Sequence, residues 1–192
     1  KIGDDVDVLV ARVKDKTDDK IVRIQAITNL GNIHDSRAIP ALFMALEEYE
    51  MQQAAYQALI KIGMPAVESL IAILKSKNAI VREGAIKALE GIGDKSAVEP
   101  LINLLKDNDY SVRQAAVLAL GTIGDFRAIG ALINILNNKD SDMRNRAAEA
   151  LGRIGGLKSS DVLIKFLKDK DYLVRTASAD ALGMIGDSKA VE

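Results

Sequence analysis

One short phrase recurs six times along this chain, and its regular spacing restricts the possible folds more than any other feature. The clearest copies run from Leu120 to Asp125 and from Leu182 to Asp187. The leucines that begin the copies stand at positions 30, 59, 89, 120, 151 and 182, so successive copies are 29 to 31 residues apart. Such a period is typical of tandem units that stack on one another, since a single unit cannot bury its own apolar face.

Each unit is predicted to contain two helices joined by a tight turn. In the third unit, Val81, Ala85 and Leu89 recur at the spacing of one helix face. Gly93 follows, and glycine commonly ends a helix in the left-handed conformation. The next segment, 98–105, is apolar on most sides, so neighbouring helices must cover it. We therefore predict an all-α solenoid of six tandem two-helix repeats.

The period also predicts the boundaries of the units within a single repeat domain, residues 1–192. Residues 4–15 are expected to form an orphan second helix that precedes the first complete unit. Residues 188–192 are expected to begin a second helix, so the chain is interpreted as a section of a longer array. The predicted repeats span approximately 18–48, 49–76, 77–106, 107–138, 139–169 and 170–192, with the last one truncated.

Composition argues against several classes of function. The chain contains no cysteine, which excludes thiol catalysis and thiolate metal sites and agrees with a reducing cytoplasm. Lys and Arg number 26 against 27 Asp and Glu, a balance that makes nucleic-acid binding an unfavoured alternative. No apolar run reaches the roughly 18 residues that a membrane span needs. We predict a cytoplasmic protein with no membrane segment.

The residues that often carry catalysis are interpreted as structural. His34, the only histidine, stands where other units have the turn glycine, so we expect it to end a helix. Asp94, Asp125 and Asp187 recur at one turn position and are expected to cap helices. We therefore predict no catalytic residue, no cofactor-binding residue and no metal site.

The glycines of the repeated phrase do not form a phosphate-binding loop, because no Gly-x-x-x-x-Gly-Lys-Ser/Thr stretch is present. Eleven of the 14 glycines, among them Gly121 and Gly124, are placed in the turn between the paired helices.

A second regularity marks the start of each first helix, where an acidic or amide residue precedes an arginine by four positions. The first residue is a natural N-cap, and the arginine can pair with it or with the cap of a neighbouring unit. Five units have such a pair, and the second unit has Glu48 and Gln52 instead. The predicted structural ladder is Asp19 and Arg23, Asn78 and Arg82, Asp109 and Arg113, Asp140 and Arg144, and Asp171 and Arg175.

The segment from Val112 to Asp125 has the pattern Val-Arg-x-x-Ala-x-x-Ala-Leu-Gly-x-Ile-Gly-Asp, which resembles HEAT repeats. The resemblance is closest to the short subclass first noted in phycobilisome lyases. It implies a right-handed superhelix with first helices on the convex face and second helices on the concave face. The second unit, 51–76, departs most from the pattern and is expected to be the least regular.

Positions that vary between units on the polar line of the second helices are the candidate binding residues. A tailored binding groove and an unselected solvated face both predict such variation, so both interpretations stay open. The lysines among them make an acidic partner segment conceivable. The candidates are Met44, Ala72, Lys75, Asn103, Lys106, Asn134, Asn137, Lys165 and Lys168, with Glu47 at the equivalent place in the first unit.

The leading hypothesis is a non-catalytic scaffold or regulatory module that binds a protein or peptide on its concave helix face. The resemblance supplies a first alternative, a subunit of a phycobilin lyase that attaches a chromophore to its acceptor protein. A second alternative is a HEAT-like nucleic-acid-binding protein, which the balanced charge and the absence of tryptophan disfavour.

Overall fold

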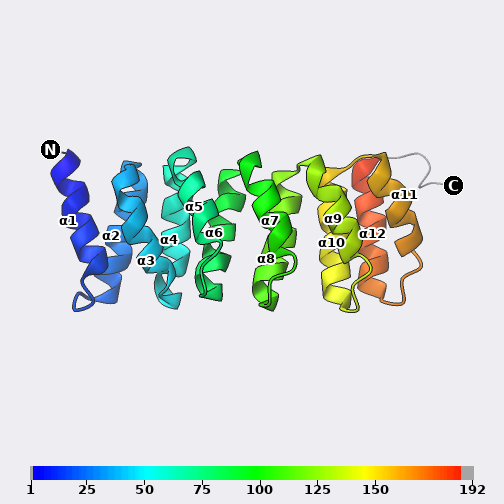
Figure 1. Ribbon diagram of the computed structural model, residues 1–192, viewed down its shortest axis with the longest axis horizontal. Helices are drawn as coiled ribbons and strands as arrows, with labels where there is room; N and C mark the ends of the chain where they lie inside the picture. The colour runs from blue at the N-terminus through cyan, green and yellow to red at the C-terminus, as the bar shows by residue number, and fades with distance from the viewer. Residues whose placement is uncertain (1, 187–192) are drawn as a thin grey trace. The chain divides into compact units, whose positions relative to one another are not determined.

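The computed structural model describes residues 2–186 and, for side chains, residues from Asp5 onward. This part of the chain is helical throughout and contains no strand (Figure 1). The predicted all-α solenoid of two-helix repeats is confirmed. The helix expected to begin at Ser188 lies outside the described residues.

Two kinds of helix alternate along the chain. The first helices of the repeats, here called A helices, have 14 residues each, so their equivalent positions can be numbered from 1 to 14. They are α2 (Lys20–Ile33), α4 (Tyr49–Ile62), α6 (Ala79–Ile92), α8 (Tyr110–Ile123), α10 (Ser141–Ile154) and α12 (Tyr172–Ile185).

The second helices, here called B helices, are shorter. They are α3 (Ile39–Leu46), α5 (Val67–Ile73), α7 (Val98–Leu104), α9 (Ile129–Ile135) and α11 (Leu157–Phe166). The orphan helix predicted at 4–15 corresponds to α1 (Ile2–Lys14). Short 3₁₀ turns precede four B helices, at Ser36–Ala38, Met64–Ala66, Lys95–Ala97 and Phe126–Ala128.

The chain divides into two compact units, Lys1–Asp94 and Lys95–Glu192. In the first unit, α4 lies between α2 and α6, and α1, α3 and α5 cover these A helices from one side. In the second unit, α10 lies between α8 and α12, and α7, α9 and α11 form the covering layer. Each unit is therefore two layers of helices around a shared apolar core.

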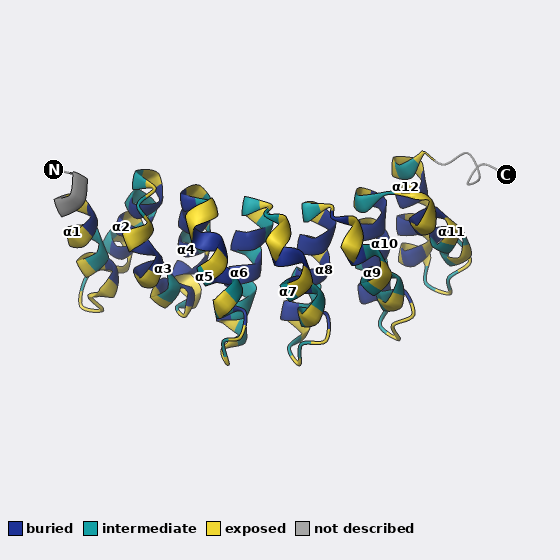
Figure 2. Ribbon diagram, turned by 45° about the horizontal axis from the view of Figure 1, so that its top comes forward, coloured by how far each residue is buried: buried dark blue, intermediate teal, exposed yellow. Residues whose placement is uncertain are grey.

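The leucines that begin the repeated phrase lie in this core. Those at 30, 59, 89, 120 and 151 are fully buried, and Leu182 is 4% exposed. Figure 2 shows that the A helices carry buried residues on the side turned toward neighbouring helices and exposed residues on the outer side. Burying a leucine side chain contributes about 1.5–3 kcal/mol, so one leucine per period strongly favours this stacking.

Both ends of the A helices are explained by local sequence. The side chain of Asp19 accepts a hydrogen bond from the Ile21 N–H, and Asn78, Asp109, Asp140 and Asp171 cap their own helices in the same way. At the other end, Gly124 has φ of 71° and Gly186 has φ of 69°. His34 takes the same left-handed conformation with φ of 60°, as expected for a residue that ends a helix.

The placement of both glycines of the phrase in the turn was wrong, because the first one lies within the A helix. A Cβ atom on Gly121 would lie 2.8 Å from the Cα of Ala150, and one on Gly152 would lie 2.7 Å from the Cα of Ala181. These glycines therefore let the backbones of successive A helices approach closely, a role that a periodic pattern alone does not reveal.

The recurring turn aspartate caps the 3₁₀ turn that leads into a B helix. Asp125, which is 4% exposed, accepts hydrogen bonds from the backbone N–H and the guanidinium of Arg127. The hydrogen bonds from the Arg127 guanidinium, and secondly the one from its backbone N–H, lower the pKa of Asp125 to about 2. Asp187 lies outside the described residues.

Candidate functional site

The structure places all nine candidate binding residues on the exposed side of the B helices. In the first unit, Met44 is 46% exposed, and Ala72 and Lys75 are exposed beside it. The six candidates of the second unit are exposed as well, on or just after α7, α9 and α11. Within each unit they stand at two equivalent helix positions, one turn apart. The exposed sides of the B helices are called the B face below.

The charges on the B face follow the direction of its helices. Glu68 and Glu99 stand in the first turns of α5 and α7, whereas Lys75 and Lys106 stand just beyond their last turns. This is the arrangement that the helix dipole favours, with acids near the N-terminus and bases near the C-terminus. The lysines among the candidate binding residues are thus explained in part by their favourable interaction with the helix dipole, which requires no partner.

The described residues contain no cluster that resembles a metal site and no single helix that could span a membrane. Among residues 2–186, no three His, Cys, Asp or Glu side chains gather closely enough to hold a metal ion. No single helix in the same range is long and apolar enough to cross a membrane. Taken together, α4 and the segment Met64–Ile73 reach that length and composition, but they are bent by 115° at their junction.

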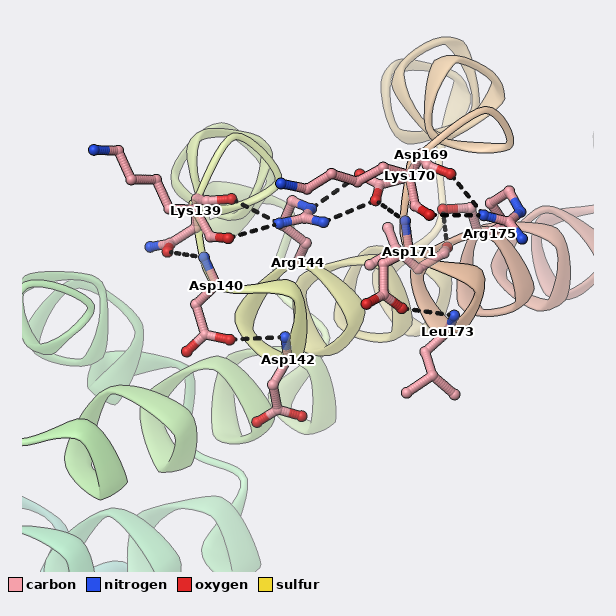
Figure 3. Close-up of polar contacts among 12 residues, drawn as sticks. Lys139, Asp140, Asp142, Arg144, Asp169, Lys170, Asp171, Leu173 and Arg175 are labelled. Carbon is pink, nitrogen blue, oxygen red and sulfur yellow. Dashed lines mark hydrogen bonds and ion pairs between the residues drawn. The ribbon is translucent and has the colours of Figure 1, made fainter.

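Ladder arginines bind backbone carbonyls of the loop that joins the preceding B helix to their own A helix. In Figure 3, one terminal nitrogen of Arg144, Nη1, donates to the carbonyls of Asn138 and Lys139 at 3.0 and 3.1 Å. Arg113 contacts the carbonyls of Asp107 and Asn108 in the same way. Because a partly buried carbonyl without a hydrogen-bond partner costs free energy, each of these arginines stabilises the loop that precedes its own helix.

Arg144 also reaches forward to the segment that leads into the next A helix. Its Nε and Nη2 atoms donate to the two carboxylate oxygens of Asp169 at 2.9 and 2.8 Å, which is a bidentate pair (Figure 3). The side chains are 5% and 9% exposed, so the pair is almost fully removed from water. Above all, hydrogen bonding to Arg144 holds the pKa of the Asp169 carboxyl below its ordinary value.

Arg23 makes the corresponding contacts in the first unit. It donates to the Val13 carbonyl at 2.9 Å and to both carboxylate oxygens of Glu48. The sequence had left open whether these arginines pair with the cap of their own helix or with a neighbouring unit. Neither Arg23 nor Arg144 pairs with the cap of its own helix, because each binds a carboxylate that stands at or just before the cap position of the next A helix.

The second repeat has no arginine at position 4 of its A helix and uses Gln52 there. The Gln52 amide donates to the carbonyl of Ile80, at position 2 of the next A helix, at 2.6 Å. Its cap position is occupied by Glu48, whose carboxylate pairs with Arg23 and makes no capping hydrogen bond. This repeat is thus the one that departs from the ladder, as its sequence indicates.

Sequence reasoning missed an open depression of about 560 Å³ between α4 and α6, called the α4–α6 cleft below. Tyr49, at the edge of the cleft, is 80% exposed, and Ile80 is 37% exposed. The only sequence signal was the aromatic and aliphatic character of positions 1, 2 and 8 in this pair of A helices. The cleft is lined by Tyr49, Glu50, Gln52, Gln53, Tyr56, Ile80, Glu83 and Lys87.

The equivalent place between α8 and α10 is bridged by side chains. Asp142, at position 2 of α10, accepts a hydrogen bond from the Tyr110 hydroxyl at 3.0 Å and another from the Gln114 amide. Arg146 of the same helix donates to this carboxylate at 3.1 Å. Burial and the neighbouring carboxylates of Asp140 and Asp142 raise the pKa of Tyr110 to about 12.

Comparison with known proteins gives a family match along almost the whole chain. A family model described as HEAT repeats matches residues 6–75, 67–152 and 129–192. Phycocyanobilin lyase subunit alpha from Picosynechococcus sp. is 37% identical over 75 residues, which are 34% of this chain and 28% of that protein. The chain therefore matches less than a third of the length of this curated relative.

Two solved structures share the fold. The complex of CpcE and CpcF of phycocyanin lyase from Nostoc sp. PCC7120 is 28% identical, with a TM-score of 0.60 over 97% of this chain and 80% of that one. A designed armadillo repeat protein in complex with the peptide (KR)4 has a TM-score of 0.59 at 18% identity, over 92% and 98% of the two chains. At that identity the second likeness concerns the fold alone.

Proposed function

Since this chain belongs to the HEAT-repeat family, we propose that it is a non-catalytic scaffold or regulatory module that binds a protein or peptide partner on its B face. The observation that carries the proposal is the contrast between core and surface. One leucine per repeat is kept in the core, whereas the exposed B-face positions change from Met44 through Ala72 and Asn103 to Lys165. A rigid array with a variable outer surface can be matched to one partner.

The experiment is a comparative pull-down with two variants matched in charge. The test variant changes Asn103, Lys106, Asn134 and Lys165 of the B face to Glu. The control variant changes two neutral and two basic exposed A-helix residues to Glu, namely Gln57, Lys61, Thr122 and Arg153.

A partner of the B face should be enriched from the native source by the wild type and by the control variant, but lost with the test variant. Circular dichroism must first give the same helix content for all three proteins. A protein retained equally by all three, or lost equally with both variants, would argue against the B face as the binding surface.

A second candidate function is a subunit of a phycobilin lyase, favoured by the likeness to phycocyanobilin lyase subunit alpha and to the CpcE and CpcF complex. The test mixes the protein with phycocyanobilin, a candidate second subunit and an acceptor phycobiliprotein. A lyase subunit should change the visible absorbance of the bilin and leave it covalently attached to the acceptor. An unchanged spectrum and free bilin under denaturing conditions would refute this candidate.

A further inference from the structure

The α4–α6 cleft has the composition of a binding site for a cationic side chain. Its walls combine the rings of Tyr49 and Tyr56 with the carboxylates of Glu50 and Glu83. The cleft lies between A helices of the first unit, so it is separate from the B face. Either proposal can fail without the other.

The cleft is open because position 2 of α6 is an isoleucine. In the bridged junction, Asp142 at this position receives hydrogen bonds from positions 1 and 5 of the preceding A helix. Ile80 has no acceptor on its side chain, and among the described residues the side chains of Tyr49 and Gln53 have no hydrogen-bond partner. The two side chains therefore border the depression without closing it.

A cation already lies in this cleft. The Lys87 ammonium is 5.7 Å from the centroid of the Tyr56 ring and 2.6 Å from a carboxylate oxygen of Glu83. At the other edge, Lys20 pairs with Glu50. Both lysine side chains are well exposed, at 37% and 48%, so solvent-exposed lysines fill these positions when no ligand is present.

We propose that the α4–α6 cleft binds an arginine side chain presented by a partner peptide. A guanidinium is planar, stacks on a tyrosine ring and binds a carboxylate through two parallel hydrogen bonds, whereas an ammonium acts as a point charge. The methylenes of the arginine would lie against Ile80, and its guanidinium would replace Lys87 between Tyr56 and Glu83. The carboxylates of Glu50 and Glu83 are each paired with one exposed lysine, Lys20 and Lys87, so an arginine enters the cleft by exchanging with a lysine that solvent can hydrate.

The test uses three capped tripeptides, Gly-Arg-Gly, Gly-Lys-Gly and Gly-citrulline-Gly, added to the full chain labelled with ¹⁵N. Citrulline has nearly the shape of arginine without its charge. The arginine peptide should shift amide signals of α4 and α6 with a dissociation constant on the order of millimolar. The lysine peptide should bind more weakly and the citrulline peptide should produce no shift.

Variants locate the binding within the molecule. Tyr56→Leu should weaken the arginine peptide about 2- to 30-fold, the range of one cation–π contact. Ile80→Asn should reduce binding further, because its amide oxygen offers Tyr49 and Gln53 an acceptor that can close the cleft without adding a negative charge. The matched control is Asp142→Ile in the other junction, which should leave peptide shifts on α4 and α6 unchanged.

Three results would overturn the proposal. One is the absence of shifts on α4 and α6 with the arginine peptide. Another is equal binding of the arginine and citrulline peptides, which would mean that charge is not recognised. The last is unchanged binding in both Tyr56→Leu and Ile80→Asn, with each variant shown to be folded by its ¹⁵N spectrum.

Discussion

The junction between α4 and α6 and the junction between α8 and α10 join helices of equal length, yet one is open and the other is bridged. The difference begins at position 2 of the second helix, which is Ile80 in one junction and Asp142 in the other. An aspartate there collects hydrogen bonds across the junction, and an isoleucine leaves the opposite polar groups in water. One residue in each repeat can therefore decide whether two A helices enclose a usable surface.

A second difference concerns how closely the backbones approach. In the bridged junction, Gly121 faces the backbone of Ala150, so nothing larger than glycine is accommodated without movement. In the open junction the same helix position is Ile60, and a Cβ on Gly91 would meet the Cδ1, Cγ1 and Cγ2 atoms of that side chain and no backbone atom within 4 Å among its three nearest contacts. The open junction is thus spaced by a large side chain, whereas the bridged one is not.

The largest expected effect comes from the arginine that the second repeat lacks. Arg144→Met should lower the free energy of unfolding by about 3–5 kcal/mol, because it leaves the carboxylate of Asp169 buried without its partner. Gln52→Met should cost only about 1 kcal/mol, since it removes one neutral hydrogen bond. Urea denaturation followed by circular dichroism measures both values. Equal losses would mean that the two residues stabilise their repeats equally.

The same pair predicts a pH dependence. The pKa of Asp169 is lower in the folded protein than its ordinary value of 3.8, so its contribution to stability is present above that pH and is lost as pH falls. Arg144→Met should therefore lose less stability than the wild type between pH 5 and the acid transition, and Gln52→Met should retain the wild-type slope. If the free energy of unfolding fell with the same slope below pH 5 in all three proteins, the Arg144–Asp169 pair would not be the source of the pH dependence.

The next effect tests how closely the helices approach. Gly121→Ala places a Cβ 2.8 Å from the Cα of Ala150 and should destabilise the protein by about 1–3 kcal/mol. Gly91→Ala is the matched control in the open junction, because the new Cβ would meet only the side chain of Ile60, and alanine favours the helix by up to about 1 kcal/mol. Thermal unfolding should rank Gly121→Ala well below Gly91→Ala. The reverse order would refute the account of the two junctions.

A smaller effect is expected when the bridged junction is opened. Asp142→Ile removes an exposed acceptor and should cost at most about 1 kcal/mol. The pKa of Tyr110 should fall from about 12 but stay above its ordinary value of 10.0, since burial and Asp140 remain. In the wild type, the raised pKa of Tyr110 means that its contribution to stability is present below pH 10 and is lost toward pH 12. Phenolate absorbance during an alkaline titration measures the change, and an unaltered curve would exclude Asp142 as a cause.

The smallest effect on stability is expected for Ile80→Asp, within about 0.5 kcal/mol, because the position is partly exposed. The structural effect should be clear, since the new carboxylate can accept hydrogen bonds from Tyr49 and Gln53 as Asp142 does from their counterparts. A crystal structure of the variant measures whether the α4–α6 cleft closes. If the cleft stays open, position 2 does not decide the difference.

Features that depend on a few consecutive residues were predicted well from the sequence. Asp109 caps α8, Gly124 ends it in the left-handed conformation, and Leu120 lies in the core, as the repeated phrase indicated. The exposed candidates of the B face were also selected correctly as surface positions, because helical periodicity separates buried from exposed residues. Their binding role stays a prediction.

Features that depend on contacts between residues far apart in the sequence could not be predicted in this way. Arg144 binds Asp169, which is 25 residues away in sequence, and the alternative partner in its own helix was equally plausible from spacing. Gly121 looked like a turn residue because its contact with Ala150 exists only after the helices have packed. The α4–α6 cleft was missed because its lining comes from two helices whose facing positions no local pattern specifies.

The sequence by itself determined that this protein is a stack of two-helix repeats, since a leucine, a cap and a turn residue in every period leave few other ways to bury the apolar surface. Only the tertiary structure decided what lies between the stacked A helices. The spacing of two helices and the partners of their facing side chains depend on the residues of both repeats together. For that reason a bridged junction and an open cleft can arise from helices that follow the same pattern.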